Sequence, residues 1–168
     1  GCFGRFGSMS AADHAIFCHT PQTGETVLST GPAPTPYHVY DGHGLVLLGH
    51  GDAAALASVF AAQDVHPVLT ESGKCILVLF ICDFTEASLG PHNEFHVTVL
   101  CAPTPGQTIS NDPAAALAAL ATRPNWGVLS LFLGNDDPHV VAYNSEYLGL
   151  DAQRSKGHIH RKPGAIEF

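Results

Sequence analysis

Two neighbouring segments predict the centre of the fold. The stretch Lys74–Phe84 is rich in β-branched and aromatic residues and has no polar alternation, which is typical of a strand buried on both faces. After a short turn, the segment Glu94–Cys101 alternates apolar residues with Glu94, His96 and Thr98. Because successive side chains of a strand point to opposite faces, this second strand has one apolar face and one face that carries functional groups.

The rest of the chain predicts further strands around helices. Proline and glycine make residues 20–36 loop-like, and Asp41-Gly42 is a turn signal typical of hairpins. Strands joined mostly by hairpins, with helices between them, indicate an α+β fold rather than a doubly wound sheet. The predicted strands are Tyr37–Tyr40, Leu45–His50, Lys74–Phe84, Glu94–Cys101, Trp126–Leu133, His139–Tyr143, His158–His160 and Ala165–Phe168. The predicted helices are Ala53–Ala62, capped by Asp52, then Asn111–Leu120, and a short helix within Asn144–Ala152.

Charge, length and cysteine usage exclude several classes of protein. With 7 Lys and Arg against 15 Asp and Glu, the net charge is −8, so no basic face is expected for nucleic acid or for an anionic membrane. No apolar run is long enough to span a bilayer, and 168 residues suit one domain. The 5 cysteines show no CxxC spacing, which favours free thiols in a reducing compartment and hence a cytoplasmic location.

The two ends of the chain are interpreted separately. Met9 follows Gly7-Ser8, a step typical of a cloning remnant, so residues 1–8 are expected to be such a remnant or a disordered N-terminus. Residues 9–168 are expected to form a single domain. Its last strand runs off the chain at Phe168, and an unpaired strand leaves an open edge. We therefore expect a sheet that closes with fewer strands, or a C-terminally incomplete domain that a homo-oligomer or a partner segment completes.

The turn between the two central strands carries a family resemblance. It reads Ser88-Leu89-Gly90-Pro91-His92-Asn93-Glu94. This segment resembles the acetoacetate decarboxylase family, in which a Gly-Pro-(aromatic)-Asn-Glu step lies between two central strands of a closed, cone-like antiparallel sheet. The resemblance is specific at residues 88–95 and loose over the rest of 32–168. It implies an acetoacetate decarboxylase-like α+β fold with two or three flanking helices and a glutamate facing a cavity at the centre of the cone.

By that resemblance, Glu94 is the central carboxylate and His92 replaces a tyrosine. Family decarboxylases form a Schiff base with a lysine in a Gly-Arg-Glu-x-x-Gly-x-Pro-Lys-Lys stretch, where a second lysine lowers the pKa of the nucleophile. Here the corresponding region, Leu150–Pro163, has its basic residues in another order and without adjacent lysines. Lys156 or Lys162 is the candidate amine, with Arg154 or Arg161 as its cationic neighbour. The alternative is that both lysines are exposed on a loop.

The resemblance implies a small-molecule lyase, decarboxylase-like or aldolase/dehydratase-like, that acts on a keto acid or a related carbonyl compound. Glu94 would position or protonate the substrate with help from His96 and His92, and a C-terminal Lys or Arg would hold a substrate carboxylate. No cofactor is expected. A non-catalytic module that binds a small carbonyl or carboxylate ligand on the same fold is the alternative. The catalytic candidates are Glu94, His96, His92 and Lys156; the substrate-binding candidates are Arg154, Arg161, Lys162 and Tyr37.

A metal site is a further interpretation of the same strand. His92, Glu94 and His96 are spaced by two residues, so on one strand they share a face and could bind a divalent metal, with His158 and His160 completing the site. The alternative is that His92 lies in the turn and that Glu94 and His96 form a hydrogen-bonded pair lining a cavity. Three ligands on a short strand would crowd one ion, and 11 histidines make chance pairs common, so no metal is expected.

Overall fold

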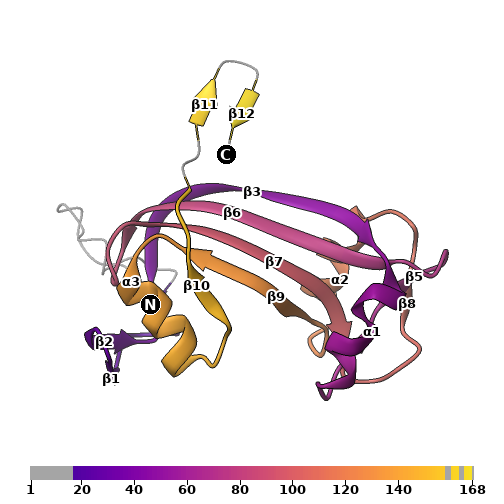
Figure 1. Ribbon diagram of the computed structural model, residues 1–168, viewed down its shortest axis with the longest axis horizontal. Coiled ribbons are helices and arrows are strands. Elements are labelled where there is room, and N and C mark those ends of the chain that lie inside the picture. The colour runs from indigo at the N-terminus through magenta and orange to yellow at the C-terminus, as the bar shows by residue number, and fades with distance from the viewer. Residues whose placement is uncertain (1–16, 158–159, 163–164, 168) are drawn as a thin grey trace. The chain divides into compact units, whose positions relative to one another are not determined.

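The computed structural model describes residues 17–157, 160–162 and 165–167, and this part of the chain has an α+β architecture (Figure 1). The strands are β1 (Gly24–Leu28), β2 (Gly31–Thr35), β3 (Val39–Gly51), β4 (His66–Pro67), β5 (Leu69–Thr70), β6 (Cys75–Ala87), β7 (His92–Ala102), β8 (Thr108–Ile109), β9 (Gly127–Asn135), β10 (Ala152–Arg154), β11 (His160–Lys162) and β12 (Ala165–Glu167). The helices are α1 (Ala53–Ala61), α2 (Ala114–Thr122) and α3 (Pro138–Ala142), and a π-helical segment η3 (Tyr143–Tyr147) continues α3. None of these described helices combines the length and the apolar character that crossing a membrane requires.

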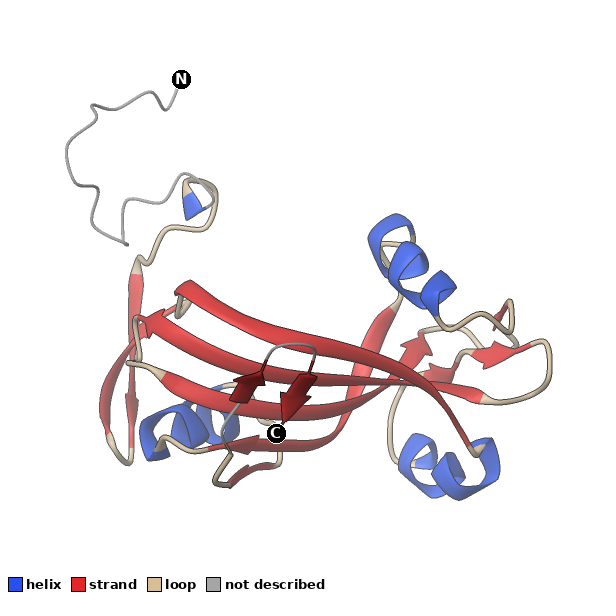
Figure 2. Cartoon of the chain, turned by 90° about the horizontal axis from the view of Figure 1, so that it is seen from above, coloured by secondary structure: helices blue, strands red, loops and turns tan. Residues whose placement is uncertain are grey.

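Eight of the described strands form one sheet. Its hydrogen-bonded path is β10-β9-β7-β6-β5-β8, with β3 also paired to β6 and β4 to β7. The long strands β3, β6, β7 and β9 lie side by side in both views (Figures 1 and 2). The path ends at β10 and β8, so within the described residues the sheet is open, and the predicted closure is wrong. The terminal strands explain this, because β8 pairs with β5 over only Leu69↔Thr108 and Thr70↔Ile109, too short an edge to close a barrel.

Contacts divide the chain into two compact units. The first takes the described residues up to Gly44, then Ile81–Phe95, and those from Leu133 onward; the second takes Leu45–Phe80 and His96–Phe132. Each unit has buried hydrophobic clusters of its own.

In the second unit, α1 and α2 cover opposite faces of the sheet (Figure 2). Phe60 of α1 belongs to the same cluster as Cys75, whereas Ala116 of α2 belongs to the cluster of Ile76, the next residue along β6. Successive residues of β6 therefore face different helices. This two-sided cover explains why the first half of the strand is apolar without alternation. The predicted burial is confirmed for Cys75, Ile76, Val78 and Ile81, whereas the other residues of Cys75–Phe84 are half-buried.

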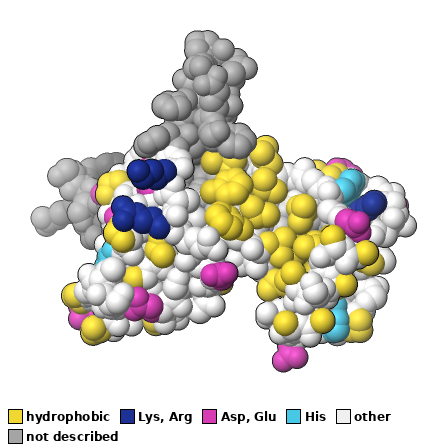
Figure 3. Space-filling view, in the orientation of Figure 1, with side chains coloured by type: hydrophobic (Ala, Val, Ile, Leu, Met, Phe, Trp, Pro, Cys, Tyr) yellow, Lys and Arg dark blue, Asp and Glu magenta, His cyan; other side chains and the backbone are white. Residues whose placement is uncertain are grey.

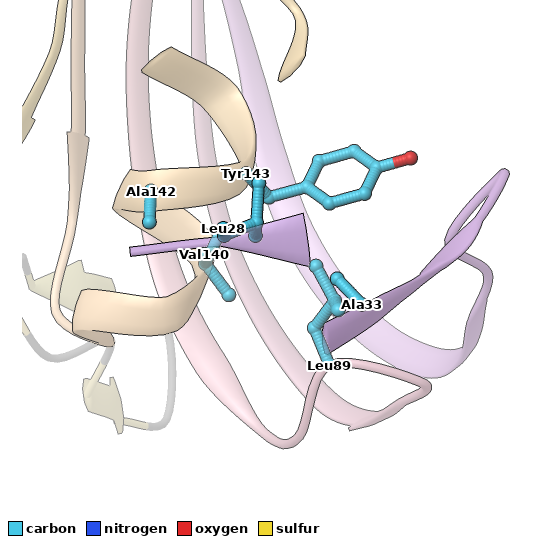
Figure 4. Close-up of a cluster of buried hydrophobic side chains, with 6 residues drawn as sticks. All are labelled: Leu28, Ala33, Leu89, Val140, Ala142 and Tyr143. Atoms are coloured by element: carbon cyan, nitrogen blue, oxygen red, sulfur yellow. The ribbon is translucent and has the colours of Figure 1, made fainter. Parts of the chain in front are cut away.

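The first unit has a smaller core, drawn in Figure 4. It joins the β1–β2 hairpin and the β6–β7 turn to α3 and η3. The ring of Tyr143 points away from the aliphatic members of the cluster (Figure 4) and meets the ring of Tyr37 edge-on, with centroids 5.2 Å apart. The members are Leu28, Ala33, Leu89, Val140, Ala142 and Tyr143.

The predicted hairpin at Asp41-Gly42 is wrong, because β3 runs through it without a turn. A Cβ on Gly42 would lie 2.8 Å from the carbonyl oxygen of Asp83, and one on Gly44 would lie 2.5 Å from that of Ile81. The glycines therefore allow the backbone of β3 to approach the backbone of β6 closely. Glycine in a strand can mark such a close approach as well as a turn.

The predicted strand at His139–Tyr143 is also wrong, because this segment is helical. The Asp137 side chain accepts hydrogen bonds from the backbone N–H groups of His139 and Val140, and Pro138 occupies the first turn. An acidic cap followed by proline is a helix start, which overrides the β propensity of the two valines.

Residues 20–36 were expected to be a loop, but they contain the antiparallel hairpin β1–β2. Within the described chain, β2 pairs with β1 alone and is therefore an edge strand. Proline has no backbone N–H to donate, which an edge strand tolerates because one of its sides has no neighbouring strand.

Other predictions are confirmed. Asp52 caps α1 by accepting a hydrogen bond from the N–H of Ala54 at 2.9 Å, and α2, β6, β7 and β9 lie where expected. One expectation is corrected here: the last described strand, β12, is not unpaired, since it pairs antiparallel with β11. Cys18, Cys75, Cys82 and Cys101 are free thiols. Residues 1–8, which include Cys2, as well as His158, Ile159 and Phe168, lie outside the described residues.

Candidate functional site

Glu94 lies near the start of β7, the strand between β6 and β9. Its Oε2 accepts a hydrogen bond from Nδ2 of Asn135 at 3.1 Å, and Oδ1 of Asn135 accepts one from Nδ2 of Asn144 at 3.0 Å. Asn135 is fully buried and Asn144 is 3% exposed. Because buried amides need partners, these two residues, here called the amide chain, orient the half-buried carboxylate.

A second set of hydrogen bonds fixes the strand ends around Glu94. The backbone N–H and Nδ2 of Asn93 donate to the two carboxylate oxygens of Asp136, at 2.7 and 2.8 Å. The backbone N–H of Asp136 donates back to the carbonyl of Asn93 at 3.3 Å. The start of β7 is therefore tied to the end of β9, which brings Glu94 and Asn135 together.

Tyr37 is close enough to this carboxylate for the charge of Glu94 to act on its phenol. Burial and the negative charge of Glu94 raise the pKa of the Tyr37 phenol to about 12, with smaller contributions from Tyr143 and Cys82. The backbone N–H of Tyr37 donates to the hydroxyl of Tyr143 at 3.3 Å, which positions the residue. At neutral pH the phenol keeps its proton and can donate a hydrogen bond next to Glu94.

Cys82 on β6 is also close enough to Glu94 for the charge of the carboxylate to act on its thiol. Burial, and then the charge of Glu94, raise the pKa of its thiol. A Cβ on Gly44 would lie 3.1 Å from the Cys82 sulfur, so glycine on β3 leaves room for this side chain. A thiol that stays protonated is a weak nucleophile, so Cys82 is suited to packing and hydrogen bonding rather than to covalent chemistry.

His92 is the first residue of β7 and is 3% exposed, so the interpretation that placed it in the turn is wrong. Its Nδ1 lies 2.8 Å from the carbonyl oxygen of Gly90, a turn residue with φ +91°. Its ring meets Phe84 edge-on at 5.0 Å and lies 6.4 Å from the ring of Tyr37. Its Nε2 is buried and has no hydrogen-bond partner among the described residues.

His96 belongs to the second unit. Its Nε2 lies 3.0 Å from the hydroxyl of Ser130 on β9, and its ring centroid lies 6.1 Å from that of Phe80. No three His, Cys, Asp or Glu side chains of the described chain form a group that could hold a metal ion. The interpretation of His92, Glu94 and His96 as metal ligands therefore finds no support in the described geometry.

The basic candidates lie on and after β10. This strand pairs in parallel with β9 so that Arg154 stands opposite Asn135, and the N–H of Ser155 donates to the Asn135 carbonyl at 2.8 Å. The side chain of Arg154 is exposed, and so is that of Lys156. Arg161 and Lys162 lie on β11. Arg154 is thus the basic residue that the described register places next to the amide chain.

The sequence did not indicate Asn135, Asn144, Cys82 or Asp136 as parts of this site. Asn135 and Asp136 stand in a run of polar residues that is typical of a turn, and nothing local distinguishes a buried asparagine from an exposed one. For Asn135 and Asp136, the one signal in the sequence is their position just after the predicted strand Trp126–Leu133.

A surface pocket of about 560 Å³ lies elsewhere, in the second unit. None of the predicted site residues contributes to it. Its lining is Ala61, Ala62, Gln63, Asp64, Val65, Cys101, Val128 and Leu129.

Comparisons of this chain with protein-family models, with curated proteins and with solved structures find no match.

Proposed function

We propose that this chain is a small-molecule lyase of the acetoacetate decarboxylase-like type, acting on a keto acid or a related carbonyl compound. The setting of Glu94 carries the proposal. A half-buried carboxylate on a central strand is oriented by Asn135 and lies beside Tyr37, whose phenol stays protonated. A positioned acid–base group next to a neutral hydrogen-bond donor is the arrangement that carbonyl chemistry requires.

The proposed reaction assigns one role to each group. Tyr37 donates a hydrogen bond to the substrate carbonyl oxygen, and Arg154 binds the substrate carboxylate. In decarboxylation, the bond from the α carbon to the carboxylate breaks, carbon dioxide leaves, and the electron pair forms an enolate on the carbonyl oxygen. Glu94, which first takes a proton from water, delivers that proton to the α carbon of the enolate and returns to the carboxylate form.

The parallel register supports the role of Arg154. Arg154 stands opposite Asn135 on the neighbouring strand, and Asn135 donates a hydrogen bond to Glu94. The backbone of Arg154 is therefore next to the residue that orients the carboxylate. The long arginine side chain can bind a carboxylate with two parallel hydrogen bonds from such an exposed starting point.

Acetoacetate and other small keto acids test the proposal in an assay of carbon dioxide release and product formation. Glu94→Gln should lower kcat at least about a hundredfold, the usual effect of losing a general acid or base. The control Glu86→Gln removes an exposed carboxylate near the end of β6, the strand next to the one that carries Glu94, and should leave kcat unchanged. Equal rates in the two variants would overturn the role of Glu94.

The Schiff-base route is tested separately by borohydride trapping of a keto acid. Covalent capture that disappears in Lys156→Arg or Lys162→Arg, and persists in Lys74→Arg, would assign the amine. Lys74 is the matched control because it is an exposed lysine in the turn before β6. Turnover without capture would assign the enolate route instead.

The exposure of Lys156 favours a second candidate function, a non-catalytic module that binds a small carboxylate or carbonyl ligand. In that case the native protein would bind keto acids without turnover, and Glu94→Gln would change affinity but no rate.

A further inference from the structure

The buried imidazole of His92 presents an unused acceptor. A backbone carbonyl only accepts hydrogen bonds, so the contact of 2.8 Å to Gly90 requires the proton on Nδ1. In the neutral ring, the lone pair then lies on Nε2. This atom is buried and has no partner among the described residues. A buried polar atom without a partner is unfavourable and calls for a ligand or a water at that position.

His92 lies in the same cluster as Glu94. The two residues are separated by one position on β7, so their side chains leave the strand on the same face. Tyr37 is the neighbour of both, since its ring lies 6.4 Å from that of His92 and its phenol is affected by the charge of Glu94. The unpaired nitrogen therefore adjoins the proposed reaction site rather than a separate region.

The cluster offers two acceptors and one donor. In the described part of the chain, Asn135 binds Oε2 of Glu94, and no hydrogen bond occupies Oε1. The hydroxyl of Tyr37 is likewise without a hydrogen bond among the described residues. With Nε2 of His92, the free groups are a carboxylate oxygen, an imidazole nitrogen and a phenol. A ligand matched to them has a hydrogen-bond donor as well as a carbonyl acceptor.

We propose that Nε2 of His92 accepts a hydrogen bond from a substrate hydroxyl, so that the Glu94 site takes a small hydroxylated keto or carboxylic acid. This inference rests on the proposed function and specifies its substrate class. A substrate without a hydroxyl would leave Nε2 unpaired once water is excluded, and a site with an unpaired buried acceptor rejects such an analogue.

Acetoacetate and 3-hydroxybutyrate form a matched pair of probes, because they differ only in an oxo group against a hydroxyl at C3. Calorimetric titration of the full chain with acetoacetate and with each enantiomer of 3-hydroxybutyrate gives three dissociation constants. We expect one enantiomer to bind at least about tenfold more tightly than acetoacetate, the effect of one satisfied buried hydrogen bond.

Two variants separate the nitrogen atoms of His92. In His92→Asn, the amide reaches the Nδ1 position and can keep the bond to Gly90 but has no acceptor at Nε2, so the preference should fall to about onefold. In His92→Gln, the amide oxygen reaches the Nε2 position, so much of the preference should persist. Thermal unfolding of both variants shows that each is folded before the titrations are compared.

The outcomes distinguish this inference from the proposed function. Equal binding of the two probes by the native chain, or a preference that His92→Asn leaves intact, overturns the inference while a keto-acid lyase stands. A hydroxyl preference that depends on His92, without turnover, supports the inference and rejects the lyase. Absence of binding of either probe overturns both.

Discussion

At the scale of single residues, Asn135 should contribute most to the arrangement of Glu94. It is fully buried, donates to the carboxylate and accepts from Asn144. Asn135→Ala removes both hydrogen bonds and leaves the amide of buried Asn144 without this acceptor, so we expect a loss of unfolding free energy of about 2 kcal/mol. The control Asn125→Ala removes an exposed asparagine and should change stability by less than about 0.5 kcal/mol. Urea denaturation compares the two, and equal losses would contradict the role of the amide chain.

Tyr37 should titrate well above an ordinary tyrosine. Burial first, and the charge of Glu94 second, raise its pKa from 10.0 to about 12. We expect a tyrosinate absorbance step near pH 12 that is missing in Tyr37→Phe. In Glu94→Gln the step should move to lower pH, because one of its causes is removed, whereas a step unchanged in Glu94→Gln would contradict the proximity of the two groups.

The raised pKa of Tyr37 makes the free energy of unfolding fall as the pH rises in the alkaline range. Below pH 10 the phenol is protonated in both the folded and the unfolded chain, so the native state keeps the full benefit of burying it neutral. Between about pH 10 and 12 the unfolded chain releases this proton first, which lowers the free energy of unfolding by an amount on the order of 2 kcal/mol. We expect the alkaline loss of stability to be smaller in Tyr37→Phe, as measured by denaturation across this range.

The sequence identified part of the site at this scale. Tyr37, His92 and Glu94 were candidates, and the structure places them in one unit. Whether they act as proposed stays a prediction. Asn135 and Cys82 were missed, because burial of a polar side chain depends on which distant segments pack over it, and that information is absent from the local pattern.

At the scale of elements, the glycines of β3 determine how closely this strand approaches β6. A Cβ on Gly44 would lie 2.5 Å from the carbonyl oxygen of Ile81, and backbone atoms cannot yield easily. We expect Gly44→Ala to lower the free energy of unfolding by about 2 kcal/mol or more. Gly49→Ala on the same strand meets nothing within 4 Å and should be neutral or stabilising by up to about 1 kcal/mol. Thermal unfolding of both variants tests this, and similar melting temperatures would contradict the close approach.

The start of α3 depends on Asp137. Its carboxylate accepts from the N–H groups of His139 and Val140, at 2.7 and 3.2 Å. Asp137→Ala should cost about 1 kcal/mol of stability, and Asp137→Asn much less, because asparagine is also a good cap. Asp151→Ala, at an exposed position, serves as the control in the same denaturation series. A cost as small as that of the control would contradict the capping role.

The elements that the sequence predicted well are those with strong local signals. The Asp52 cap and the alanine-rich segment gave α1, and the unbroken apolar run gave β6. The failures share one cause, since Asp41-Gly42 and residues 139–143 each fit two structures locally. Contacts with segments distant in sequence select one of the two structures. At Gly42, for example, the close approach of β6 requires an extended strand with a glycine at this position.

At the scale of the whole molecule, the thiols report on folding. In a Cys2→Ser background, we expect a thiol reagent to modify exposed Cys18 rapidly and to reach Cys75 and Cys101 only on unfolding, because both are buried and burial raises their pKa. Cys82 should react slowly. Mass spectrometry of the modified chain locates the labels, and rapid labelling of Cys75 or Cys101 in the native protein would contradict the described core.

Sheet closure was the expectation that failed at this scale. It came from the resemblance at Ser88–Glu94 and from the open edge expected at the last strand. The order of strands and helices, in contrast, predicted the α+β class correctly. The parallel pairing of β10 with β9, and the pairing of β4 with β7, involve segments separated by other elements, and alternation within each strand carries no information about such partners.

The tip of the β1–β2 hairpin is linked to Glu94 through η3. Glu146 accepts hydrogen bonds from the backbone N–H of Ser29, at 2.8 Å, and from the Ser29 hydroxyl. Glu146 shares one π-helical turn with Asn144, the first member of the amide chain. A substitution at Ser29 could therefore change the angle of the Glu94 carboxylate without altering any residue that contacts it.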